Sequence, residues 1–318
     1  MNKPLRIVFM GTPEFAAGIL QSLVANSYKV VGVVTSPDKP AGRGRQMQTS
    51  AVKQLSDTYH IPVLQPEKLS DTSFLAQLRA WEADLFVVVA FRMLPEAVWG
   101  MPSRGTFNLH ASLLPQYRGA APINWAIING ERETGVTTFF IDHEIDTGNI
   151  IFFEKTSIDE NENAGTLHDK LLEIGARLVL KTIDCIADNT AHSTPQPVIG
   201  ELKSAPKIFK ETGKINWHDT AQHIHNLVRG LSPSPVAFSE FYKEGGMKIS
   251  VKIFETIQEV IAHDCEIGSI VCNGRDLLKV ACADGFLHIK TLQLAGKKRM
   301  TINDFLLGFR DIAQYRFI

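Results

Sequence analysis

An amide and an imidazole stand two residues apart in the segment Thr106–Pro115, which reads TFNLHASLLP. These groups belong to Asn108 and His110, and in a strand the side chains at positions i and i+2 point to the same face. A carboxylate, Asp146, follows in the run Ile145–Gly148. A hydrogen-bond donor, a proton carrier and a carboxylate that orients it are the groups needed for acyl transfer through a tetrahedral intermediate.

The elements that must position these groups alternate along the first half of the chain. Short, continuous apolar runs predict buried strands at Leu5–Met10, Val30–Val34, Leu85–Ala90, Phe107–Leu109 and Val136–Ile141. Helical spacing of apolar residues predicts helices between them, over residues 15–24, 49–59, 72–81 and 122–129. This alternation is typical of a mostly parallel sheet with helices on both faces, in which ligands bind at the carboxyl ends of the strands.

The motifs of several cofactors are missing. The first turn, Met10–Phe15, lacks the second and third glycines of a dinucleotide-binding turn, so we expect a Rossmann-like sheet without a dinucleotide site. His223 and His225 alternate without a thiol or carboxylate at ligand spacing, and we expect both on a solvated helix. The cysteines form no C-x-x-C pair and fit no zinc spacing, so we expect reduced, mostly buried thiols and no metal. They are Cys185, Cys265, Cys272 and Cys282.

The second half of the chain has a different pattern. A long helix is predicted at Ala164–Ala187, and the polar, proline-containing stretch 189–197 after it is the candidate linker. A helix at Trp217–Val228 follows. About five short β-like runs then fit a small β-barrel, with a closing helix at Thr301–Phe309. The runs are Val236–Tyr242, Met247–Phe254, Gly268–Val271, Leu277–Ala281 and Phe286–Leu292.

The bulk properties agree with a globular protein of two domains. The chain has 318 residues, of which 44% are hydrophobic and 21% charged. It has no apolar run long enough to cross a membrane and no signal-peptide pattern at its start, so we expect a cytoplasmic protein. The net charge is −1, but residues 201–318 hold 16 Lys and Arg against 13 Asp and Glu. This modest basic excess is weak evidence for nucleic-acid binding by the C-terminal part.

The Asn-Leu-His triplet, the Ser112–Pro115 loop and Asp146 resemble the active-site signature of the 10-formyltetrahydrofolate-dependent formyltransferases. The resemblance runs almost end to end, and its basic motifs favour the branch of the family that acts on methionyl-tRNA. The other matching segments are Gly11–Phe15, Lys39–Gly44, Gln116–Pro122, Ala205–Ile208 and Leu292–Met300. The resemblance implies a catalytic domain at residues 1–188, a linker at 189–208, and a smaller C-terminal OB-like β-barrel domain at 209–318 that binds tRNA.

The resemblance also implies the site chemistry. The formyl donor would be 10-formyltetrahydrofolate, with no metal, and Asn108, His110 and Asp146 would be catalytic. Two loops would bind the folate, through Ser112, Leu113, Leu114 and Pro115 and through Phe91 and Arg92. The second loop departs from the family, because Ala90-Phe91-Arg92-Met93-Leu94-Pro95 is one residue shorter and lacks a glycine.

The acceptor implied by the resemblance is methionyl initiator tRNA, bound by a protein that we expect to be a monomer. The expected tRNA contacts are Lys39, Arg43, Arg45, Lys207, Lys297, Lys298 and Arg299. The glycine-rich basic segment 36–48 follows the second strand, on the carboxyl side of the sheet, where a pliable cationic loop suits a phosphate backbone. Three alternatives stay open. They are a formyltransferase for a nucleotide-sugar amine or for glycinamide ribonucleotide, a non-catalytic folate- or RNA-binding module, and a folate hydrolase.

Overall fold

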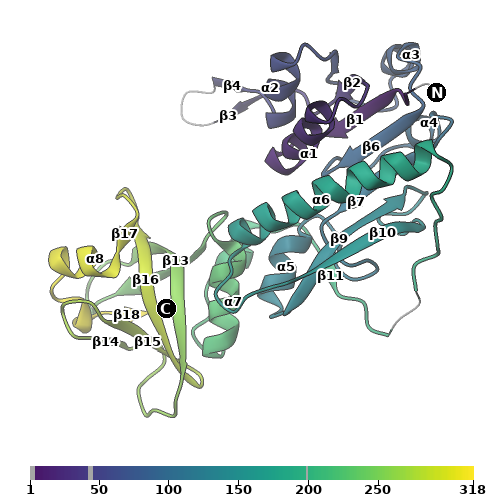
Figure 1. The fold of residues 1–318 in the computed structure, drawn as a ribbon. Coiled ribbons are helices and arrows are strands. Elements are labelled where there is room, and N and C mark those ends of the chain that lie inside the picture. The colour runs from purple at the N-terminus through teal and green to yellow at the C-terminus, as the bar shows by residue number, and fades with distance from the viewer. Residues whose placement is uncertain (1–3, 42–45, 198–199) are drawn as a thin grey trace. The chain divides into compact units, whose positions relative to one another are not determined.

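The computed structural model describes residues 4–41, 46–197 and 200–318. Within this part the chain divides into two compact units (Figure 1). The first consists of Met1–Pro122, Thr134–Thr156 and His168–Ser204, and the second of Ile123–Glu133, Ser157–Leu167 and Ala205–Ile318. Two short early segments therefore belong to the unit that contains the C-terminal third of the chain.

A seven-stranded sheet forms the centre of the first unit, in the order β10-β9-β7-β6-β1-β2-β5. The pairs β1–β2, β1–β6, β2–β5 and β6–β7 are parallel, whereas β7 and β9 are antiparallel. The strands are β1 (Ile7–Gly11), β2 (Val30–Val34), β5 (Val63–Leu64), β6 (Leu85–Val89), β7 (Thr106–His110), β9 (Glu133–Phe140) and β10 (Ile150–Ser157). This is the mostly parallel, Rossmann-like sheet that the sequence predicts.

Helices cover both faces of this sheet. Val8 and Met10 pack in one buried cluster with Phe74 of α3 and Val98 of α4. On the opposite face α6 lies so close to β7 that a Cβ on Gly175 would stand 2.8 Å from a methyl carbon of Leu109. The helices are α1 (Glu14–Ala25), α2 (Ala51–Thr58), α3 (Thr72–Ala80), α4 (Glu96–Trp99) and α6 (Ala164–Ala187), the last of which begins in the second unit.

The basic segment after β2 is not a simple loop. It forms a two-stranded antiparallel hairpin of β3 (Lys39–Ala41) and β4 (Gln46–Gln48), which the apolar pattern does not predict because the segment is polar. A second small pair joins β8 (Arg118–Gly119) to β11 (Ser204–Ala205).

The second unit is an antiparallel barrel with the strand order β14-β15-β16-β13-β12-β18. An isolated bridge between Ser269 and Arg316 links the two ends of this order, so the barrel is nearly closed. Register shifts around Glu255 bend the long strand β13, as closure requires. The strands are β12 (Ala237–Tyr242), β13 (Ile249–Val260), β14 (Ile270–Cys272), β15 (Leu278–Cys282), β16 (Gly285–Leu294), β17 (Met300–Thr301) and β18 (Arg316–Phe317).

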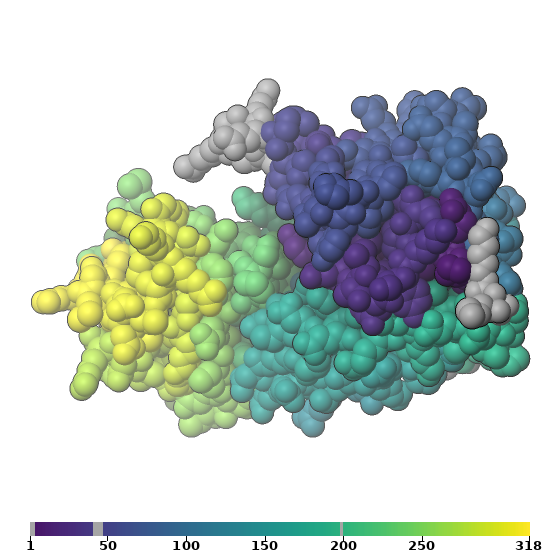
Figure 2. All heavy atoms as spheres, turned by 45° about the horizontal axis from the view of Figure 1, so that its top comes forward, coloured from purple at the N-terminus to yellow at the C-terminus, as the bar shows by residue number. Residues whose placement is uncertain are grey.

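A buried apolar cluster fills this barrel and includes Trp217, Val228, Phe241, Ile253 and Leu287. Residues 205–318, green to yellow in Figure 2, make up most of this unit. The helical elements of the unit are α5 (Pro122–Ile128), α7 (Ala221–Leu231), α8 (Ile302–Gly308) and the short 3-10 turns η1 (Lys210–Gly213) and η2 (Ile312–Gln314). The predicted small barrel is confirmed, although its two shortest strands, β17 and β18, were not expected.

Candidate active site

Strand β7 carries both polar residues of the Asn-x-His pair at its carboxyl end. It pairs with β6 on one side, where Val88 lies opposite Asn108, and with β9 on the other, where Thr137 lies opposite His110. Strand β6 is apolar and buried throughout, whereas β9 places the buried hydroxyls of Thr137 and Thr138 beside β7. His110 is buried, and Asn108 is half-buried. Asn108 Oδ1 is buried and finds no hydrogen-bond partner among the described residues, which marks it as an acceptor for a bound molecule.

The hydrogen bond of the His110 ring decides which nitrogen is free to react. His110 Nε2 lies 2.8 Å from the carbonyl oxygen of Tyr117, and the ring is buried. A carbonyl oxygen only accepts hydrogen bonds, so Nε2 carries the proton and Nδ1 of the neutral ring has a free lone pair. That nitrogen is 3.8 Å from Asp146 Oδ2.

The carboxylate of Asp146 is held by the backbone. The Gly119 amide donates to Asp146 Oδ2 over 2.9 Å, and only 12% of the aspartate side chain is exposed. The 3.8 Å between Asp146 Oδ2 and His110 Nδ1 is too long for a hydrogen bond but short enough for an ionic interaction. The carbonyl of Tyr117, rather than Asp146, therefore orients the neutral imidazole, and Asp146 is placed to stabilise it once it is protonated.

Unusual backbone conformations produce this geometry. Tyr117 and Asp146 both have positive φ angles, 59° and 57°, which side-chain-bearing residues seldom adopt. The Tyr117 amide is bonded to the Lys203 carbonyl over 2.7 Å. A Cβ on Gly148 would lie 1.7 Å from the carbonyl oxygen of Phe140, so the turn after Asp146 accepts only glycine there. Tyr117 and Gly119 were missed as functional positions because they act through backbone atoms, which residue spacing does not reveal.

The loop after β7 is closed by its own hydrogen bonds. The Ser112 hydroxyl donates to the Gln116 carbonyl over 2.6 Å, and the Thr137 hydroxyl donates to the Ser112 carbonyl over 2.7 Å. Ser112 and Leu114 are buried, Leu113 is half-buried, and the Leu114–Pro115 peptide bond is cis. These hydrogen bonds hold the loop backbone in place, and the Ser112 hydroxyl is already engaged as a donor.

The second predicted folate loop begins at Ala90, which has a positive φ of 46°. Phe91 packs partly buried against the core of the first unit. The Arg92 guanidinium donates to the carbonyl oxygens of Pro66 and Glu67, which ties this loop to the segment after β5. Those two bonds show that Arg92 fixes the loop, and they leave fewer of its donors for a ligand.

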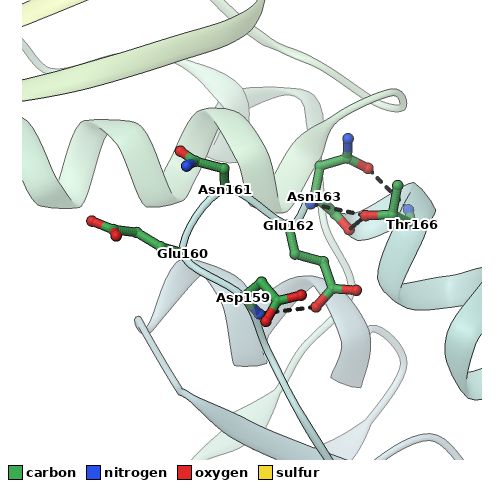
Figure 3. A pocket seen from close by; sticks show the side chains of 6 residues that line it. All are labelled: Asp159, Glu160, Asn161, Glu162, Asn163 and Thr166. Carbon is green, nitrogen blue, oxygen red and sulfur yellow. Dashed lines mark hydrogen bonds between the residues drawn. The ribbon is translucent and has the colours of Figure 1, made fainter.

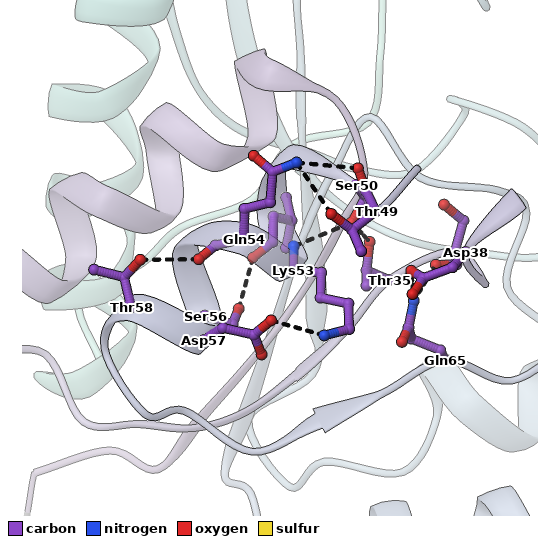
Figure 4. A network of polar contacts seen from close by, with 12 residues as sticks. Thr35, Asp38, Thr49, Ser50, Lys53, Gln54, Ser56, Asp57, Thr58 and Gln65 are labelled. Atoms are coloured by element: carbon purple, nitrogen blue, oxygen red, sulfur yellow. Dashed lines mark hydrogen bonds and ion pairs between the residues drawn. The ribbon is translucent and has the colours of Figure 1, made fainter. Parts of the chain in front are cut away.

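The base of the basic hairpin is fastened by a polar network (Figure 4). The hydroxyls of Thr35 and Ser50 are 2.8 Å apart, and the Gln65 amide donates to the Ser36 carbonyl and to Asp38 over 2.8 and 2.7 Å. Ser50 also caps α2. Lys39 is exposed on β3, whereas the predicted tRNA contacts Arg43 and Arg45 lie outside the described residues.

The remaining predicted cations are exposed residues of the second unit. Lys207 lies over the Phe209 ring at 5.8 Å, and the Arg299 guanidinium lies over the Phe254 ring at 4.3 Å. Lys297 and Lys298 are exposed in the turn between β16 and β17. These three consecutive cations therefore share one turn of the barrel.

The prediction for the two alternating histidines is wrong for one of them. His223 is exposed and pairs with Asp219 at 2.9 Å. His225 is buried and bonded to the Thr256 hydroxyl, because α7 turns this position toward β13. Its burial, with a contribution from the Arg229 charge, lowers the pKa of His225 below the usual value for histidine.

The cysteines are free thiols, but the expectation that most are buried is wrong. Cys282 is buried, Cys185 and Cys272 are half-buried, and Cys265 is exposed. Within the described part of the chain, no group of three His, Cys, Asp or Glu residues is placed to hold a metal ion. None of the helices in that part is long and apolar enough to cross a membrane.

A hollow in the second unit shares no residue with the cluster around His110 (Figure 3). Its lining includes three acidic side chains and no cation. A folate or a tRNA is anionic, so this hollow suits neither. The lining residues are Asp159, Glu160, Asn161, Glu162, Asn163 and Thr166.

Comparisons with known proteins match most of the chain to two family models. The model of the formyl transferase family matches residues 5–183, and that of the formyl transferase C-terminal domain matches residues 207–310. The methionyl-tRNA formyltransferase of Bacteroides fragilis is 54% identical over 311 residues, covering 97% of this chain and 96% of its own. That of Flavobacterium johnsoniae is 51% identical over 312 residues and 98% of each chain.

Two solved structures share the fold at lower identity. The sugar 3N-formyltransferase WlaRD, solved with dTDP and 5-N-formyl-THF, has a TM-score of 0.64 and 23% identity over 93% of this chain and 100% of its own. HypX from Aquifex aeolicus, in complex with tetrahydrofolic acid, has a TM-score of 0.63 and 19% identity over 96% of this chain and 48% of its own. The match to both family models, together with relatives at more than half identity, shows that the chain belongs to the formyl transferase family.

Proposed function

We propose that the protein transfers the formyl group of 10-formyltetrahydrofolate to the α-amino group of methionyl initiator tRNA, in support of translation initiation. The observation that carries this proposal is the cluster of Asn108, His110 and Asp146 in a chain whose near-full-length relatives are methionyl-tRNA formyltransferases. The folate bound in two structural neighbours supports the donor class. The buried, unpartnered Asn108 amide oxygen fits a site that a ligand completes.

The chemistry follows from the positions of the polar atoms. The methionyl amine attacks the formyl carbon, and the carbonyl oxygen becomes an oxyanion. The Asn108 amide can donate to that oxygen, and removal of one such donor typically costs about 10²–10³ in rate. The attacking amine loses a proton, the bond between the formyl carbon and N10 breaks, and N10 gains a proton. No covalent bond to the protein is needed.

His110 and Asp146 divide the proton transfers. His110 Nδ1, the free nitrogen of the neutral ring, can take up a proton from solvent before the attack and then donate it to the oxyanion or to departing N10. The Asp146 carboxylate, 3.8 Å away, offsets the positive charge of the imidazolium until that proton has been donated, and it then receives the amine proton through a water molecule. General acid–base catalysis of this kind contributes roughly 10²–10⁴ in rate.

The folate and tRNA contacts are also part of the proposal. Ser112–Pro115, Phe91 and Arg92 would line the folate site. Lys39, Arg43 and Arg45 would meet the end of the tRNA, and Lys207, Lys297, Lys298 and Arg299 would bind phosphates farther away. Residues 1–188 would form the catalytic domain, 189–208 the linker and 209–318 the tRNA-binding domain. We further propose a cytoplasmic monomer that uses no metal.

A comparison of acceptors tests the proposal against the nucleotide-sugar alternative. Purified protein and 10-formyltetrahydrofolate are incubated with methionyl initiator tRNA, methionyl elongator tRNA, or a nucleotide amino-sugar. We expect rapid formylation of the initiator tRNA and none of the sugar. Transfer to the sugar alone would overturn the acceptor assignment, and folate binding without transfer to any acceptor would favour a non-catalytic module.

A further inference from the structure

The side chain of Gln196 connects the two backbone segments that hold the Asp146 carboxylate. Its Nε2 donates to the carbonyl oxygens of Asp146 and Gly148 over 2.8 and 3.0 Å. Its Oε1 accepts a hydrogen bond of 2.6 Å from the Arg118 guanidinium. Both N–H groups and the carbonyl of this half-buried amide are therefore engaged.

These three bonds reach both sides of the carboxylate. Asp146 lies on one side, in the turn that its positive φ creates. On the other side Arg118 directly precedes Gly119, whose amide donates to Asp146 Oδ2. One amide thus ties the residue that bears the carboxylate to the segment that donates to it. The distance between Asp146 and His110 therefore depends on how the segment around Asp146 is placed relative to the segment of Arg118 and Gly119.

Gln196 is itself well anchored. It lies between Pro195 and Pro197, whose rings restrict the backbone. Two residues earlier, Thr194 exchanges a pair of backbone hydrogen bonds with Ile150 at the start of β10, at 2.8 and 2.9 Å. The stretch after α6, which composition alone presents as a linker, therefore contains a fixed segment of the first unit.

We propose that Gln196 is a positioning residue for formyl transfer, which holds the Asp146 carboxylate at its working distance from His110. The inference rests on the proposed function. Glutamine suits the position because only a neutral amide offers two donors to carbonyls and an acceptor to a guanidinium. A glutamate there would keep the bond to Arg118 but would place a carboxylate oxygen against the carbonyls of Asp146 and Gly148.

We call the three hydrogen bonds of the Gln196 side chain, to Arg118, Asp146 and Gly148, the Gln196 clamp. The nearly isosteric substitution Gln196→Glu tests it. A displacement of about 1 Å in a catalytic group can cost about 10² in rate, so we expect kcat to fall about 10- to 100-fold, with KM for the folate and the tRNA changed less than about threefold. Gln77→Glu makes the same substitution on the exposed face of α3 and should leave kcat unchanged. A kcat for Gln196→Glu within threefold of wild type would overturn the proposal.

A double-mutant comparison shows whether Gln196 acts through Asp146. In an Asp146→Asn background, Gln196→Glu should cost less than about threefold, because the charge that it positions has already been removed. A full multiplicative loss would mean that Gln196 acts independently of Asp146, which contradicts the inference. Gln196→Met, which lacks both donors and adds no charge, should behave like Gln196→Glu and provides a second variant if the glutamate prevents folding.

Hydrogen exchange keeps this test separate from the test of the proposed function. The clamp predicts faster amide exchange in residues 142–149 of Gln196→Glu than of wild type, in the absence of any substrate. If wild type formylates no tRNA but exchange in residues 142–149 is still faster in Gln196→Glu, the proposed acceptor is wrong and the positioning role of Gln196 is kept. Unchanged exchange in an active enzyme would refute the clamp alone.

Discussion

The substitution Asp146→Asn removes the charge next to His110 while leaving the local geometry in place. The amide oxygen of asparagine can still accept the Gly119 hydrogen bond, which is 2.9 Å long in the native structure. What is lost is the attraction between a carboxylate and an imidazolium that are 3.8 Å apart. Both side chains are mostly buried, with 7% and 12% of their surfaces exposed, so solvent screens this attraction only in part.

The size of the effect follows from the distance. Two unit charges about 4 Å apart interact by about 4 kcal/mol at an effective dielectric constant of about 20. Each 1.36 kcal/mol corresponds to about tenfold in rate, so the full charge is equivalent to about 10³. Because the imidazole is only partly protonated in the transition state, we expect kcat to fall about 10²–10³-fold, with KM for the folate nearly unchanged.

Single-turnover formyl transfer with both substrates saturating measures this loss directly. Glu144→Gln is the matched control, because it removes an exposed carboxylate two residues away on the same loop and should retain wild-type activity. An Asp146→Asn variant that kept more than a tenth of the wild-type kcat, or a Glu144→Gln variant that lost as much activity as Asp146→Asn, would contradict the electrostatic role of Asp146.

Three further predictions concern other parts of the chain. Arg43→Ala should raise KM for charged tRNA or strongly lower kcat/KM without changing folate affinity, and the affinity of wild type for tRNA should fall steeply with salt. Equal tRNA kinetics in wild type and Arg43→Ala, together with a flat salt dependence, would show that the basic segment does not contact tRNA. Burial raises the pKa of the Cys282 thiol to about 11, so a thiol reagent at pH 8 should label exposed Cys265 and reach Cys282 only after unfolding, as mass mapping would show. Burial lowers the pKa of His225, so the folded state resists its protonation and loses stability as the pH falls below about 6.5. The urea midpoint of the barrel should therefore drop between pH 7.5 and 5.5 more in wild type than in His225→Gln, and equal drops would contradict this assignment.

Most of the fold could be predicted because continuous apolar runs indicate buried strands. Residues 85–89 are all buried in β6, and the run at 107–109 is the centre of β7. The pattern failed where short strands are polar or are completed by distant partners. The hairpin β3–β4 has no continuous apolar run, and β18 has only two residues that pair with β12 from the end of the chain.

The residue types and order of the proposed catalytic set can be read from the sequence, but the distances between its members cannot. The position of the Asp146 carboxylate depends on its own positive φ, on the Gly119 amide and on the Gln196 clamp. None of these leaves a periodic signal in the sequence. The spacing of residue types reveals neither a hydrogen bond from a backbone amide nor a contact between residues 50 positions apart. His225 was misassigned for a related reason, since its burial depends on packing of α7 against β13.

The role of His110 and the proposed acceptor are tested together by single-turnover transfer of the formyl group from 10-formyltetrahydrofolate to methionyl initiator tRNA, compared between wild type and His110→Ala. Wild type should form formyl-methionyl-tRNA at least about 10²-fold faster than the variant, with folate binding retained in both. Equal rates would contradict the role of His110, and no transfer to this tRNA by the wild-type protein would contradict the proposed function itself.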